Sequence, residues 1–276
     1  GSDVDTNRKF NFVKPSLDVY YNATDRTQIF VSVRRDIGQL EFADFISALD
    51  RDDGEIDAGN PDLAPEKSWD FEIGTEHRLS DQAGVVNLRA FYRKVTDVTD
   101  QVPFGAKDSA PGNLGSGKHY GAEIETSLQL RQLGLIDAVV SMTFLWQHSN
   151  VEDPFTGVNR RFAGQKKYKL SIDARHDFQS LGISYGAAVA ASGPKIKSDF
   201  DTVERASTGF DIRLFAEKRF DNGIVGRMFW GNILQPKSKR NRTVFQESQA
   251  DAGILRTEFR TQKNGSFYGF GIRGTF

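Results

Sequence analysis

Phe210-Asp-Ile-Arg-Leu-Phe-Ala-Glu-Lys-Arg-Phe220 carries the pattern that predicts the fold class of this chain of 276 residues. One set of alternate positions, from Phe210 to Phe220, is mostly apolar, whereas the other set, from Asp211 to Arg219, is mostly charged. Successive side chains of a β-strand point to opposite faces, so the stretch predicts a strand with one apolar and one polar face.

The same alternation recurs along the chain, and no amphipathic helix competes with it. The pattern predicts eleven strands, over residues 13–21, 27–36, 66–79, 84–94, 118–132, 135–149, 165–178, 182–192, 207–220, 223–232 and 266–276.

The connections between these strands alternate strictly between two kinds. Short turns are expected near 22–26, 80–83, 133–134, 179–181 and 221–222, and long polar loops at 37–65, 95–117, 150–164, 193–206 and 233–265. Within the last loop, 243–247 and 254–260 predict a hairpin that projects from the rim. An up-and-down meander would place every long loop at one end, which is typical of outer-membrane barrels.

Aromatic residues gather at the two ends of the apolar face. At the long-loop end lie Trp69, Tyr92, Tyr120, Trp146, Tyr168, Phe210, Trp230 and Tyr268, and at the short-turn end Tyr21, Phe178, Phe220 and Phe276. Tyr168 and Phe178 lie ten residues apart, which corresponds to about 25 Å along the normal of a membrane for a strand tilted by roughly 40°. The pattern therefore predicts two interfacial girdles.

The polar face carries charges of both signs, which would keep an enclosed channel hydrated and could pair between neighbouring strands. They are Glu72, Arg89, Glu123, Glu125, Arg175, Asp211, Arg213, Glu217 and Arg219. The alternative is a soluble β-sandwich or β-helix, but sandwich strands usually have about 5–6 residues.

Composition excludes several other classes of protein. The formal charge is −1, so no global field favours nucleic acid, and the absence of cysteine excludes disulfides and thiolate metal sites. No apolar run is long enough for a transmembrane helix.

The number of predicted strands is odd, whereas single-chain bacterial barrels have an even number. An unpaired edge in lipid would be costly. We therefore expect residues 3–276 to form part of a larger barrel, and Gly1-Ser2 to be a cloning scar.

Several motifs resemble those of TonB-dependent outer-membrane receptors. Gly59-Asn-Pro-Asp-Leu-Ala-Pro-Glu66 resembles the NPxLxPE segment of that family, and Tyr120-Gly-Ala-Glu-Ile-Glu125, after Gly112-Asn113, resembles its YGxExE strand. Trp230-Gly-Asn-Ile-Leu234 stands where the family often has an NLFD-like ending, from which Leu234-Gln235 departs. Phe276, with Tyr268, Phe270 and Ile272 at alternate positions, resembles the C-terminal signal that the barrel-assembly machinery recognises.

The resemblance implies the C-terminal half of an antiparallel transmembrane barrel of twenty-two strands, without the plug and the TonB box. It implies active uptake of a scarce bulky nutrient, either a siderophore or other metal chelate or an oligosaccharide, across the bacterial outer membrane. The implied partners are outer-membrane lipid and lipopolysaccharide, the assembly machinery, the TonB complex and the ligand. Position near the upper rim makes Arg34, Arg93, His119, Gln147 and Lys167 the candidate ligand contacts.

Other motifs give weaker indications. The segment from Gly112 to His119 resembles a phosphate-binding loop, but His119 stands where that motif has a serine or threonine. The segment also precedes a predicted strand rather than a helix. The acidic run 50–57 could bind calcium or simply be solvated. The basic run 237–242 could meet lipopolysaccharide phosphates or an anionic substrate, or be solvated.

The four histidines show no metal-ligand spacing and no catalytic triad is apparent, so we expect neither enzymatic activity nor a cofactor. The alternative functions are a passive porin or autotransporter-type barrel, and a soluble binding module. The porin would need a complete, even-stranded chain and no plug.

Overall fold

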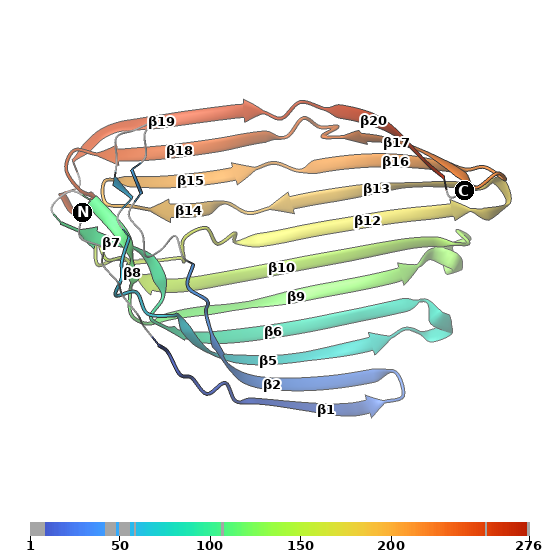
Figure 1. Ribbon diagram of the computed structural model, residues 1–276. Helices are drawn as coiled ribbons and strands as arrows, with labels where there is room; N and C mark the ends of the chain where they lie inside the picture. Colours follow the sequence, from blue (N-terminus) through green and yellow to red (C-terminus); the bar gives the residue numbers. More distant parts are fainter. Residues whose placement is uncertain are drawn as a thin grey trace.

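Eleven long antiparallel strands form one curved wall in the computed structural model (Figure 1), which describes residues 9–41, 48–49, 56–57, 59–105, 108–251 and 253–274. In their order across the sheet they are β1 (Ser16–Thr24), β2 (Thr27–Ile37), β5 (Lys67–Arg78), β6 (Gly84–Thr96), β9 (Gly117–Gln129), β10 (Ala138–Glu152), β12 (Tyr168–Phe178), β13 (Ile183–Ser192), β16 (Asp211–Arg219), β17 (Ile224–Gly231) and β20 (Phe267–Gly274).

All eleven predicted strands are present, and each pairs with its neighbours in the meander. Among the described residues, β1 and β20 are the two edges of the sheet and no pairing joins them, so the sheet is open. The long loops lie at one end of the wall and the tight turns at the other, as the alternation of connection lengths predicts (Figure 1).

Strand ends differ from the prediction where a turn tightens. The predicted strand 118–132 stops at Gln129, because residues Leu130–Leu133 form a 3-10 turn that ends at Gly134. Gly134 has φ 81°, and its amide donates to the carbonyl oxygen of Arg131. A positive φ is accessible to glycine at little cost, so this residue closes the turn. Similar 3-10 turns occupy Ser80–Gln82 and Gln179–Leu181.

The long connections contain more strand than the sequence indicated. β7 (Thr99–Phe104) and β8 (Asp108–Asn113) form a hairpin, and β3 (Ala48–Leu49) pairs with β4 (Ile56–Asp57). β11 (Asn159–Arg160) pairs with the end of β10.

The predicted hairpin in the last loop is confirmed as β18 (Lys237–Phe245) and β19 (Ile254–Lys263). A 3-10 turn, Gln249–Asp251, lies between the two strands. It belongs to a four-stranded sheet, because β14 (Lys195–Ser198) and β15 (Thr202–Thr208) pair with it in the order β14-β15-β18-β19. The long connection 193–206 therefore contains two strands that the sequence did not indicate. We call these four strands the upper sheet.

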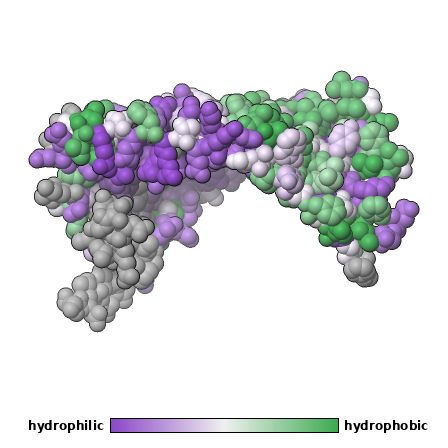
Figure 2. All heavy atoms as spheres, turned by 90° about the horizontal axis from the view of Figure 1, so that it is seen from above, coloured by the Kyte–Doolittle hydropathy of each residue, from purple (hydrophilic) through white to green (hydrophobic). Residues whose placement is uncertain are grey.

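The register of the wall separates two faces. One, the polar face, includes Asp70, Glu72, Arg89, Glu123 and Asp211, which alternate with the residues of the other, apolar face. The apolar face is exposed: the side chains of Trp69, Trp146 and Trp230 have 42%, 40% and 46% of their surface accessible. Figure 2, seen from above, shows hydrophilic residues over the loop half and hydrophobic residues over the other half.

Small glycines and large phenylalanine rings interlock on the polar face. At five positions, a phenylalanine ring lies over the glycine that is its direct partner on the neighbouring strand, so that an added Cβ would overlap the ring. The pairs are Phe30 with Gly74, Phe91 with Gly121, Phe215 with Gly186, Phe229 with Gly269, and Phe267 with Gly231. Rings that cover glycines in this way fix the register of a curved sheet.

Candidate binding surface on the polar face

An ionic network crosses four neighbouring strands on the polar face. Arg34 on β2 lies 2.6 Å from Glu72 on β5, and Arg89 on β6 lies 3.3 Å from the same carboxylate oxygen. Arg89 also pairs with Glu123 on β9. Arg89 and Glu123 are direct partners in the register, whereas Glu72 meets Arg34 and Arg89 diagonally across the neighbouring strands.

Asp70 lies at the upper end of this network and joins two of the predicted ligand contacts. Its Oδ2 is 3.2 Å from Nε of Arg93 and 3.9 Å from Nε of Arg34. The Asp70 side chain is 4% exposed, and its Oδ1 is buried without a hydrogen-bond partner, as is Oγ of Ser32. Buried polar atoms normally find partners, so this part of the wall retains hydrogen-bonding capacity.

The structure brings two further predicted contacts together beside this network. Nε2 of His119 lies 3.0 Å from Oε1 of Gln147, whose Nε2 donates to the carbonyl oxygen of Lys166 at 2.8 Å. The ring of Phe91 meets His119 edge-on, with centroids 5.0 Å apart, and the Arg93 guanidinium lies 5.8 Å from the centre of the Phe91 ring. His119 and Arg93 are thus connected through Phe91.

Lys167, the fifth predicted contact, is not part of this cluster through its side chain. Its carbonyl oxygen accepts a hydrogen bond from the amide of Gln147 at 3.0 Å, but its side chain is exposed and forms no ion pair within the described residues. Lys167 therefore lies at the same level of the wall as the other predicted contacts, but its exposed side chain is outside the ionic network.

A second polar cluster, which sequence reasoning missed, joins four of the long connections. Arg160 pairs with Asp153 and lies 2.8 Å from Asp100 of β7. Oγ of Ser198 donates to Asp153 at 2.9 Å, and Nε2 of Gln249 donates to Oγ of Ser198 at 3.0 Å. We call these five residues the loop hub. They are far apart in the sequence and share no motif, so no sequence signal could have linked them.

Asp153 is the buried centre of the loop hub. Burial alone would raise the pKa of its carboxyl group, but the hydrogen bonds from Arg160 and Ser198 outweigh burial and lower the pKa below its ordinary value of 3.8. The ionised form is therefore the one that the surrounding donors stabilise.

The two motifs that suggested the family contact one another. Asn113 donates from its Nδ2 to the carbonyl oxygens of Ala64 and Asp97, both at 2.9 Å, and its Oδ1 accepts from the amide of Ala64 at 2.9 Å. Asn60 donates to the carbonyl oxygen of Pro111 at 2.9 Å, and Leu63 is fully buried. The Asn-Pro segment therefore acts as a structural clamp on β8.

The predicted girdle residues lie on the apolar face and are exposed, except for Tyr168, which is half-buried. Tyr268, Phe270 and Ile272 are 88%, 66% and 67% exposed on the apolar face of β20. Phe276 and the acidic run 50–57 lie outside the residues whose side chains are described. The basic run 237–242 forms β18, where its side chains alternate between the two faces of the upper sheet.

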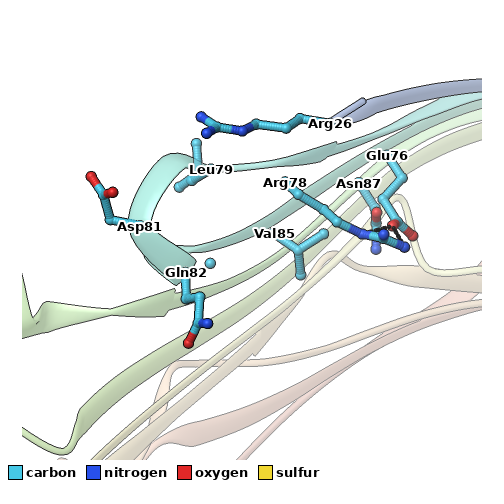
Figure 3. Close-up of a pocket in the computed structure, with 9 residues that line it drawn as sticks. Arg26, Glu76, Arg78, Leu79, Asp81, Gln82, Val85 and Asn87 are labelled. Atoms are coloured by element: carbon cyan, nitrogen blue, oxygen red, sulfur yellow. Dashed lines mark hydrogen bonds and ion pairs between the residues drawn. The ribbon is translucent and has the colours of Figure 1, made fainter. Parts of the chain in front are cut away.

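A separate hollow opens at the short-turn end of the wall (Figure 3). Arg78 and Glu76 pair there at 2.8 Å, and the Ser80–Gln82 turn forms its rim. It lies at the opposite end from the predicted ligand contacts.

Within the described residues, no group of three or more histidine, aspartate or glutamate side chains could hold a metal ion. None of the helices in that part of the chain is long and apolar enough to cross a membrane.

The chain is similar to known proteins in both sequence and fold. The sequence matches the family described as "TonB dependent receptor-like, beta-barrel" over residues 1–221. None of the curated protein sequences matches the chain.

Solved structures share the fold at low sequence identity. The chain is similar to the pyoverdine outer membrane receptor FpvA from Pseudomonas aeruginosa PAO1, with a TM-score of 0.64 and 13% identity over 95% of this chain and 36% of that one. The siderophore receptor PirA from Acinetobacter baumannii has a TM-score of 0.62 and 11% identity, over 95% and 41%. A mutant of the ferric enterobactin receptor PfeA from Pseudomonas aeruginosa has 0.61 and 15%, over 95% and 40%. The chain thus spans about two-fifths of the length of these receptors.

Proposed function

Because this chain belongs to the family of TonB-dependent receptor β-barrels, we propose that it forms the C-terminal part of the wall of an outer-membrane receptor for a ferric siderophore. In this proposal residues 3–276 supply the last strands of a larger barrel. TonB would supply the work of transport through parts of the receptor that precede this chain.

The observation that carries the proposal is the separation of the two faces of one continuous wall. The apolar face exposes tryptophan, phenylalanine and isoleucine side chains, which a soluble protein would bury. The polar face carries the linked ion pairs from Arg34 to Glu123. Such a wall is stable when lipid covers one face and water or protein fills the other.

The positions of the aromatic residues at the two ends of the strands support a location of the wall in a membrane. Tyr168 and Phe178 mark the two ends of β12, and tyrosine and tryptophan prefer the headgroup level of a bilayer. We propose that the girdle residues lie at the two interfaces, and that Tyr268, Phe270 and Ile272 form the signal that the assembly machinery reads.

The ligand would meet the upper part of the polar face. There Arg34, Arg93, His119 and Gln147 offer donors and acceptors, and Ser32 and Asp70 keep buried polar atoms without partners. Siderophores are the ligand class that the similar solved receptors are named for, and no observation on this chain favours an oligosaccharide instead.

The test is uptake of iron by the complete receptor that contains this chain. Cells that lack their own siderophore receptors would express it under iron limitation, and radioactive iron would be supplied as a panel of ferric siderophores. We expect accumulation of iron from at least one siderophore, and loss of this accumulation when tonB is deleted.

Two outcomes would contradict the proposal. Uptake that continues without TonB would indicate a passive porin. Absence of the protein from the outer-membrane fraction, together with a soluble monomer in buffer without detergent, would indicate a soluble binding module.

A further inference from the structure

The upper sheet continues the last four strands of the wall beyond their loop ends. β14 lies in line with β13, β15 with β16, β18 with β17 and β19 with β20 (Figure 1). Glu204, Arg240 and Arg242 of the upper sheet line one hollow with Asp100 of the loop hub. We call the face that carries these three side chains the inner face, and the face formed by the residues that alternate with them the outer face.

The loop hub lies on the polar side of the wall. Gln147 is on the polar face of β10, and Asp153 follows it at an alternate position just beyond the end of that strand. The inner face therefore continues the polar face of the wall, and the outer face continues the apolar face. Exposure agrees with this assignment, because Lys239 on the outer face is exposed whereas its neighbour Arg240 is half-buried.

Four cations gather on the outer face, and all four side chains are exposed. Lys237 of β18 lies directly opposite Lys263 of β19. Lys239 is a diagonal neighbour of Lys263 on one side and of Arg205 of β15 on the other. Like charges that face each other across a pair of strands destabilise a sheet. These residues, which we call the outer-face cations, therefore cost stability unless an anion joins them.

The acidic residues of the upper sheet lie on the inner face instead. Glu204 and Glu258 are both register partners of Arg242. They form ion pairs on that face, Glu204 with Arg240 and Glu258 with Arg256. Among the described residues, no ion pair involves the outer-face cations.

An apolar hollow of about 900 Å³ lies below the outer-face cations, at the upper end of the apolar face. Ala216 leaves room there, because its small side chain stands in one row between the larger side chains of Tyr185 and Met228. Trp230 and Tyr268, which are direct partners in the next row towards the loops, also line the hollow.

The cations and the hollow follow one another along the same strands. Lys263 precedes Tyr268 by five residues, which is at most about 17 Å of extended chain. In the orientation proposed above, the loop end faces the outer leaflet of the outer membrane, where tyrosine and tryptophan mark the headgroup level. A lipid of that leaflet would meet the hollow with its acyl chains and the cations with its phosphates.

We propose that the outer face of the last four strands binds one molecule of lipopolysaccharide, with the phosphates of its lipid A at the outer-face cations and an acyl chain in the hollow over Ala216. Ammonium and guanidinium groups donate charge-assisted hydrogen bonds to phosphate oxygens. The bound phosphates relieve the repulsion between Lys237 and Lys263. This inference goes beyond transport of the ligand and rests on the proposed location of the wall in the outer membrane.

The test uses the complete receptor, purified in detergent and freed of lipid, and measures lipid binding by native mass spectrometry. The two probes are lipid A with its phosphates and lipid A from which the phosphates have been removed. We expect the wild type to bind the phosphorylated probe about ten-fold more tightly or better. Lys237→Gln/Lys239→Gln should weaken that binding by about thirty-fold, because each lysine near an anionic lipid contributes about five-fold.

Three further variants separate the site from general charge and from folding. Lys197→Gln removes a cation from the inner face of β14 and should bind lipid A like the wild type. Lys237→Arg/Lys239→Arg keeps both charges and should retain most of the affinity. Ala216→Phe keeps the lipid side apolar but fills the hollow, so it should weaken the binding of both probes.

Several results would overturn the inference. Equal binding of the two probes, or an equal loss in Lys197→Gln and Lys237→Gln/Lys239→Gln, would show that the outer-face cations do not recognise the phosphates. Displacement of lipid A by excess inorganic phosphate would indicate a site for the free ion, and unchanged binding in Ala216→Phe would exclude the hollow. The proposed function fails on a different observation, which is iron uptake that is absent or independent of TonB.

Discussion

Replacing Gly269 with alanine should destabilise the pairing of β17 with β20, whereas the same replacement at Gly271 should not. Both glycines lie on the polar face of β20, two residues apart. A Cβ at Gly269 would lie 2.6 Å from Cε1 of Phe229, but a Cβ at Gly271 would have no heavy atom within 4 Å. The pair therefore isolates the contact with the ring.

The magnitude follows from two opposing effects. Forcing a methyl group against a packed ring costs about 1–3 kcal/mol. The Phe229 ring is 40% exposed but packs edge-on against Phe267 with centroids 6.1 Å apart, so moving it away from the methyl group would disturb this contact. Removing a glycine stabilises by about 0.4–1 kcal/mol through the unfolded chain. We expect Gly269→Ala to lower the free energy of unfolding by about 1–2 kcal/mol, and Gly271→Ala to raise it slightly.

The assay is equilibrium unfolding in urea of the complete receptor, refolded into lipid vesicles and followed by tryptophan fluorescence. A second change, Phe229→Leu, should reduce the cost of Gly269→Ala because the smaller side chain leaves room for the methyl group. Equal stabilities for the two alanine variants, or no coupling with Phe229→Leu, would show that the Phe229 ring does not exclude a side chain at position 269.

Three further predictions concern the loops and the lipid face. Asn113→Ala removes three hydrogen bonds and should lower the free energy of unfolding by about 2–4 kcal/mol, with faster hydrogen exchange at residues 59–66. Asn22 is exposed, so Asn22→Ala should have little effect. Unchanged hydrogen exchange in Asn113→Ala would argue against the clamp. The pKa of Asp153 is depressed in the folded protein, so the stability that its carboxylate contributes is present above the ordinary pKa of 3.8 and is lost as the pH falls through the lower folded value. Protease cleavage of the loops should therefore rise at that low pH in the wild type. Asp153→Asn should already be cleaved faster at neutral pH and should show less of this rise; identical pH profiles would contradict the role of the loop hub. Ile73→Arg on the apolar face should lower the free energy of unfolding in a bilayer by about 2–4 kcal/mol and reduce the amount of folded receptor in the outer membrane. Thr143→Arg on the polar face should be tolerated. Equal assembly of the two variants would contradict the assignment of the apolar face to lipid.

Two of the predicted ligand contacts illustrate what position in the sequence can and cannot supply. The sequence predicts His119 and Gln147 as ligand contacts only from their position along the strand and the face they share, and the structure joins them by a hydrogen bond of 3.0 Å. The same reasoning predicts Lys167, yet its side chain joins no network among the described residues. Height and face follow from counting residues along a strand, whereas contact depends on the rotamer and on the neighbouring loop.

The amino-acid sequence alone predicts the eleven strands, their two faces and the end at which the long loops lie. It could do so because alternation and turn residues act locally, over a few positions of the chain. The pairing of β14, β15, β18 and β19 into one sheet, and the joining of four connections around Asp153, are visible only in the tertiary structure. These contacts join residues tens of positions apart, and their pairing depends on how the whole wall curves.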